Sequence, residues 1–140
     1  MANQPTDDFD WVTAQSNCSA ALLFARLQET VAKDVERRNA LAGAAQIWRF
    51  ELHSEDEDRF EVSRTGARFS TARSAVVAFE RVGPRINVSG DGVDLDFTIV
   101  VGLNNAGECR YFVGEAEYPG WEIRKMALEA LFFEVEEEGI

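Results

Sequence analysis

The stretch from Trp48 to Glu117 constrains the fold more than any other part of the chain, because its apolar side chains alternate with polar ones in short segments. Trp48, Phe50 and Leu52 share one face, and in 93–103 every second residue is apolar. Glycine and asparagine turns separate these segments and leave no room for the helical crossover that parallel strands need. The sequence therefore predicts an antiparallel meander sheet of about six strands.

A helical pattern flanks this stretch on each side. In residues 17–42, Phe24, Leu27, Val31 and Val35 recur at steps of three or four, as on one buried face of a helix. Residues 121–138 also have helical character. We therefore expect one α+β domain, residues 1–140, in which a long N-terminal helix and a C-terminal helix pack on one face of the sheet.

The C-terminal helix has more apolar surface than a sheet alone can cover. Its charges also oppose the helix dipole, because Arg124 and Lys125 lie near its start and glutamates follow from 134 onward. Burial must hold it, against the N-terminal helix of the same chain, against a second copy about a two-fold axis, or in a groove that takes another partner. The residues that we expect at such a homodimer surface are Leu128, Phe132 and Phe133.

Charge is unevenly distributed in this acidic chain, whose net charge is -11. Acids dominate residues 1–61 and 91–140, whereas bases dominate residues 62–89. The overall charge disfavours binding to nucleic acid. The basic stretch can present a local patch to a carboxylate-bearing protein partner, or it can pair with acids of its own chain. The arginines of this candidate patch are Arg64, Arg68, Arg73, Arg81 and Arg85.

Motifs for catalysis, metals or cofactors do not emerge from the sequence. The single histidine, His53, lies on the polar face of an expected strand, and the glycine-rich turns match no phosphate-binding loop. Asp94 and Asp96 share one strand face, but the surrounding loop lacks the ligand order of a calcium site. We therefore predict no catalytic residue, no metal and no cofactor. Three aromatic residues are candidates for lining a ligand pocket: Trp48, Tyr111 and Trp121.

The location that the sequence favours is the cytoplasm. No apolar run is long enough to span a membrane, and the opening residues resemble no secretory signal. Cys18 and Cys109 lie far apart in the chain, and we expect them to be unpaired.

These observations favour a noncatalytic cytoplasmic protein-interaction or adaptor domain that forms a homodimer. The alternative is a small-molecule binding domain, or a carboxylate-using enzyme, with a pocket between the sheet and the helices.

Overall fold

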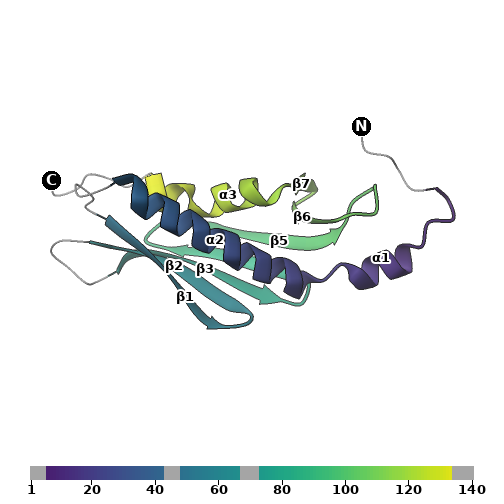
Figure 1. The fold of residues 1–140 in the computed structure, drawn as a ribbon, viewed down its shortest axis with the longest axis horizontal. Helices are drawn as coiled ribbons and strands as arrows, with labels where there is room; N and C mark the ends of the chain where they lie inside the picture. The colour runs from purple at the N-terminus through teal and green to yellow at the C-terminus, as the bar shows by residue number, and fades with distance from the viewer. Residues whose placement is uncertain (1–5, 43–47, 67–72, 134–140) are drawn as a thin grey trace.

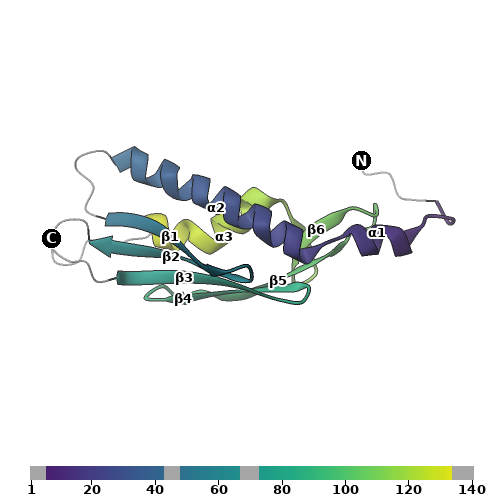
Figure 2. The ribbon, with the colours of Figure 1, turned by 60° about the horizontal axis from the view of Figure 1, so that its bottom comes forward.

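The computed structural model describes residues 6–42, 48–66 and 73–133 of the chain. These residues form a sheet of seven antiparallel strands that follow one another in sequence order, with helices on one of its faces (Figures 1 and 2), which confirms the predicted α+β meander. The strands are β1 (Trp48–Asp56), β2 (Arg59–Gly66), β3 (Arg73–Val82), β4 (Arg85–Asp91), β5 (Asp96–Leu103), β6 (Cys109–Val113) and β7 (Ala116–Tyr118).

The face of the sheet beneath the helices carries the core. In β2, Phe60 and Val62 have no exposed surface, and both pair across to apolar residues of β3, Phe79 and Val77. The rings of Phe60 and Phe79 stack with their centroids 4.5 Å apart. The period-2 alternation that predicted the strands therefore also identifies the core-facing side chains correctly.

The seventh strand is one more than the sequence predicted. Residues 108–116 were expected to be a single extended segment, but Gly114 adopts a φ of +62° and turns the chain between β6 and β7. Glycine takes such a conformation without steric cost. The resulting hairpin adds the short edge strand β7.

Helix α2 (Ala20–Ala42) follows the predicted apolar stripe, with Phe24 and Leu27 buried on the sheet. The Ser19 hydroxyl caps the start of this helix by accepting the N–H of Leu22. Near its other end, the Asn39 amide accepts the Phe50 N–H (3.1 Å) and donates to the Phe50 carbonyl (2.9 Å). The Asn39 side chain thus makes the two backbone hydrogen bonds of Phe50 that a neighbouring strand would otherwise make at this edge of the sheet.

Helix α3 (Gly120–Phe133) lies beside α2 and runs in the same direction (Figure 1). Ile123 and Leu131 have no exposed surface, and Leu128 and Phe132 are also buried within the single chain. The sheet and α2 together therefore cover most of the apolar circumference that the sequence shows. The expected continuation of this helix over 134–138 lies outside the described residues.

A short helix, α1 (Trp11–Asn17), extends beyond the sheet at the far end of the molecule (Figures 1 and 2). It buries none of its own residues. Directly after it, Cys18 forms a disulfide with Cys109 of β6, so the expectation of two unpaired cysteines is wrong. The strand order of the meander brings β6 to the start of α2, where the two Cα atoms lie 5.2 Å apart.

Within the described ranges, no helix combines the length and the apolar character that crossing a bilayer requires.

Candidate functional site

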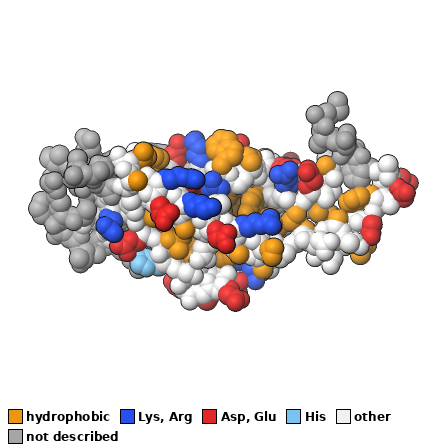
Figure 3. Space-filling view, viewed as in Figure 1, with side chains coloured by type: hydrophobic (Ala, Val, Ile, Leu, Met, Phe, Trp, Pro, Cys, Tyr) orange, Lys and Arg blue, Asp and Glu red, His pale blue; other side chains and the backbone are white. Residues whose placement is uncertain are grey.

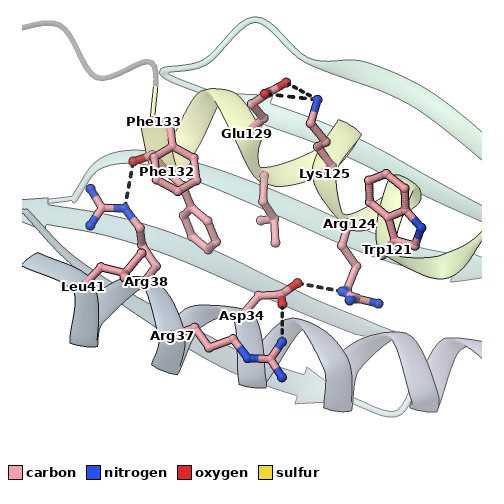
Figure 4. Close-up of a pocket in the computed structure, with 11 residues that line it drawn as sticks. Asp34, Arg37, Arg38, Leu41, Trp121, Arg124, Lys125, Glu129, Phe132 and Phe133 are labelled. Carbon is pink, nitrogen blue, oxygen red and sulfur yellow. Dashed lines mark hydrogen bonds and ion pairs between the residues drawn. The ribbon is translucent and has the colours of Figure 1, made fainter.

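A groove runs along the outer seam between α2 and α3, with a volume of about 370 Å³ (Figure 4). We call it the α2–α3 groove. Figure 3 shows lysine and arginine side chains gathered over this seam, with hydrophobic side chains between them. The groove is lined by Asp34, Arg37, Arg38 and Leu41 of α2 and by Trp121, Arg124, Lys125, Leu128, Glu129, Phe132 and Phe133 of α3.

The apolar surface of the groove is open to solvent at both ends of α3. Trp121, in the first turn, is 58% exposed, and Phe133, in the last described turn, is 64% exposed. Leu41 of α2 is exposed beside Phe133. Between these residues, Leu128 and Phe132 are buried and form the floor. Large apolar side chains left in water beside a concave floor are typical of a binding surface.

One ion pair, between Asp34 of α2 and Arg124 of α3, joins the two helices across the groove. The Asp34 carboxylate accepts the Arg124 Nε–H at 2.6 Å and lies 3.3 Å from Nη1 of Arg37 (Figure 4). Lys125 and Glu129, one turn apart on α3, lie 3.2 Å apart. Among the described residues that line the groove, two are carboxylates, Asp34 and Glu129, and four are cationic. The groove is therefore locally positive in a chain whose net charge is -11.

Arg38 closes the end of the groove near Phe133. Its Nε–H donates to the Phe132 carbonyl at 3.0 Å. Its guanidinium carbon lies 5.0 Å from the Phe50 ring centroid and 5.2 Å from that of Phe133. These contacts are within the range of a cation–π interaction, so Arg38 orients the exposed Phe133 ring.

A second arginine contacts the same end of α3 from beneath. Arg64 of β2 is only 9% exposed, donates from Nη1 to the Leu131 carbonyl at 3.2 Å, and donates from Nε to the Ser74 hydroxyl at 2.9 Å. Burial lowers the pKa of the Arg64 guanidinium from its ordinary value. Together, Arg38 and Arg64 place two positive charges at the C-terminal turn of α3, where the sequence of that helix provides none.

Of the five arginines expected to form one patch, the three whose side chains the structure describes lie apart from one another. Arg64 is buried beneath α3, whereas Arg81 lies at the opposite end of β3, where its Nη2 is 2.7 Å from Asp58. Arg85 is exposed, and β-strand alternation places it on the sheet face away from the helices. Arg68 and the side chain of Arg73 lie outside the described residues.

The three aromatic residues expected to line a pocket lie apart from one another. Trp48 packs under Arg64, whose guanidinium carbon lies 5.1 Å from the centroid of the Trp48 ring. Tyr111 donates its hydroxyl to the Leu23 carbonyl at 3.0 Å, and burial raises its pKa above the ordinary value, while Arg124 and Arg26 act in the opposite direction. Only Trp121 lines the α2–α3 groove, so the cavity lies between two helices rather than between sheet and helices.

The polar residues weighed for catalysis or metal binding are solvent-facing. His53 is exposed, with Nε2 3.4 Å from the Glu51 carboxylate, and Asp94 and Asp96 are exposed as well. Among the described residues, no three side chains of the types that commonly bind metals gather in one place.

The charged half of the groove was missed by the sequence analysis. Asp34, Arg37 and Arg38 are not among the site residues predicted from the sequence. The sequence signal that could have identified this site is an arginine at a core-facing position of the helix. A buried arginine needs a hydrogen-bond acceptor or an aromatic ring nearby.

No protein-family model, no curated protein and no solved structure matches this chain.

Proposed function

We propose that this chain is a noncatalytic protein-interaction or adaptor domain, and that the α2–α3 groove binds an apolar, acidic segment of a partner protein. The observation that carries the proposal is the combination of exposed Trp121 and Phe133 with a surplus of cations in an otherwise acidic protein.

The apolar part of the groove suits a helix that presents one hydrophobic face. Two parallel helices with a buried floor form a trough, and amphipathic helices bind in such troughs through side chains spaced three or four residues apart. Trp121, Phe133 and Arg38 also belong to the residue types that are enriched at the centre of protein interfaces.

The charged part of the groove favours ligands that carry acidic side chains. Arg37 and Lys125 are largely exposed, with side-chain exposures of 69% and 57%, so each can make a further ion pair with a ligand. Exposed pairs add little affinity, but complementary charge raises the association rate and excludes basic partners. A partner segment with carboxylates flanking its apolar face fits both properties.

A small apolar carboxylate is the second candidate ligand. The groove volume of about 370 Å³ falls within the range of small-molecule sites, and arginine side chains bind carboxylates through paired hydrogen bonds. This candidate predicts that aromatic carboxylic acids raise the unfolding temperature of the wild-type protein but not that of Arg37→Glu. A protein-binding groove predicts no such shift from the acids alone.

The proposal also includes a homodimer and a cytoplasmic location. Disulfides are rare in a reducing cytoplasm, so the Cys18–Cys109 bond gives the location a direct test. The bond itself disfavours the cytoplasm, so cells broken open in an alkylating agent should yield protein with two alkylated thiols only if the cytoplasmic location is correct and the bond forms outside the cell. Protein in which neither thiol is alkylated would place the chain in an oxidising compartment.

Selection from a random peptide library tests the groove. Wild-type protein, immobilised at low density, should enrich peptides with large apolar residues three or four positions apart and flanking acids. These peptides should bind Trp121→Ala/Phe133→Ala at least about tenfold more weakly. Arg85→Glu, which reverses a charge on the opposite sheet face, is the matched control and should bind normally. Enriched peptides that bind all three proteins equally would refute the groove as the site.

A further inference from the structure

The N-terminal segment Thr6–Asn17, which we call the N-terminal arm, is attached to the body of the molecule although its helix buries none of its own residues. The Asp10 carboxylate caps α1 by accepting the Thr13 N–H at 3.0 Å. The Phe9 ring packs over Gly107, where a Cβ would lie 2.5 Å from it. The Cys18–Cys109 disulfide fixes the base of the arm to β6. A capped helix that contributes nothing to the core is therefore attached to the body at two points, Phe9 and Cys18.

The arm presents aromatic and acidic groups to solvent. Trp11 is 63% exposed and Val12 is similarly open. Asp7, Asp8 and Asp10 are exposed beside them, and the segment contains no lysine or arginine. Figure 3 shows acidic and hydrophobic side chains together on this extension. The arm thus has the chemistry that the α2–α3 groove selects.

The arm cannot reach the groove of its own chain. It joins α2 at Ala20, whereas the groove begins at Asp34, roughly 21 Å further along the helix. The arm also points away from that region (Figure 1). Any contact between the two surfaces must therefore join two molecules.

We propose that the N-terminal arm of one copy docks in the α2–α3 groove of a second copy, and that a two-fold axis makes the exchange reciprocal. This inference rests on the proposed function of the groove and names one of its ligands. Trp11 and Val12 cover the exposed apolar surface, while Asp7 and Asp8 face Arg37 and Lys125. A reciprocal exchange closes the assembly as a dimer. Because the arm is already fixed, docking loses little conformational entropy.

Charge reversal followed by mixing tests the exchange in the full-length protein. Sedimentation at tens to hundreds of micromolar should give a dimer for the wild type. Asp7→Lys/Asp8→Lys should be monomeric because its arm no longer fits a basic groove. Arg37→Glu/Lys125→Glu should be monomeric because its groove no longer fits an acidic arm. A one-to-one mixture of the two variants should recover the dimer, since both exchanged contacts are then complementary.

The control is Arg49→Glu/Arg85→Glu, which reverses two exposed charges away from the groove and should remain dimeric. Circular dichroism of each variant confirms folding before sedimentation. A monomeric wild type, or a mixture of the two variants that stays monomeric, would overturn the exchange. Neither result affects the peptide-library experiment. That experiment tests the groove itself, because the protein is immobilised at a density where two copies do not meet.

Discussion

Helices α2 and α3 have two contact surfaces of opposite character. The inner seam lies between the helices and the sheet, and the outer seam lies where the two helices face each other. Toward the sheet, their side chains are apolar and closed to water, as Phe24 and Leu131 show. Toward each other, they combine ion pairs with large apolar side chains that remain in water, as Arg124 and Trp121 show. The same helix α3 contributes to both seams within a few residues.

This difference separates what folds the chain from what the chain can recognise. Removal of apolar surface from water stabilises the inner seam at roughly 25 cal/mol per Å². The outer seam leaves apolar surface in water, so its contribution to folding is small, and that surface is available to a ligand. The comparison therefore predicts that substitutions in the two seams affect different measurements.

The largest expected effect is in the inner seam. Phe60 has no exposed surface, and its ring lies against Phe79 and Phe24. Phe60→Ala should lower the free energy of unfolding by about 3–5 kcal/mol, because it leaves a cavity that the sheet cannot close. Urea unfolding measures this. Leu41→Ala, at the rim of the groove, should change it by less than about 0.5 kcal/mol. Similar losses of unfolding free energy for Phe60→Ala and Leu41→Ala would contradict the difference between the two seams.

Removal of the disulfide should have the next largest effect. Cys18→Ser/Cys109→Ser opens a loop of 91 residues and should lower the free energy of unfolding by about 2–4 kcal/mol. Reduction of the wild type by dithiothreitol should give the same decrease in urea unfolding. An unchanged transition would show that the bond does not constrain the chain.

Loss of Arg64 should destabilise by about 2 kcal/mol, because the Leu131 carbonyl and the Ser74 hydroxyl both lose a charged donor. Arg64→Met keeps most of the apolar stem, so it isolates the guanidinium. Arg64→Lys should recover only part of the loss, since lysine lacks the planar fork. Urea unfolding of the three proteins compares them, and equal stability of Arg64→Met and wild type would contradict the capping role.

The raised pKa of Tyr111 predicts a dependence of stability on alkaline pH. The folded state keeps the phenol protonated above the ordinary value of 10.0, where the unfolded state has begun to lose the proton. Stability should therefore be constant below about pH 9 and should fall as pH rises through the folded pKa. Tyr111→Phe should lose about 1 kcal/mol at neutral pH with its bond to Leu23, and should lack this alkaline decrease. Chemical unfolding between pH 8 and 11 compares the two.

The sequence was sufficient for the parts of the fold that depend on local pattern. Period-2 alternation predicted the meander and its core face, and steps of three and four predicted the buried stripe of α2. The short β7 was missed because three residues carry almost no periodic signal, and the turn at Gly114 was read as strand.

The candidate site depends on three-dimensional contacts that no local pattern contains. Asp34 and Arg124 are 90 residues apart. They meet because an odd number of antiparallel strands brings the chain back to the end of the sheet where α2 begins, and because α3 then packs beside α2 on the same face. The same applies to Cys18 and Cys109. Within α3 itself, Arg124 and Lys125 lie near the start and the last described turn carries no basic residue, so the helix does not compensate its own dipole. Its compensation comes from Arg38 and Arg64, which belong to other elements.

The most direct test measures stability and binding on one variant. Trp121→Ala/Phe133→Ala removes the exposed apolar surface of the α2–α3 groove and leaves the inner seam intact. We predict a free energy of unfolding within about 0.5 kcal/mol of the wild type. We also predict at least about a tenfold loss of affinity for the tightest library peptide, measured by calorimetric titration. An unchanged affinity, or a loss of stability as large as that of Phe60→Ala, would contradict the division between a folding seam and a recognition seam.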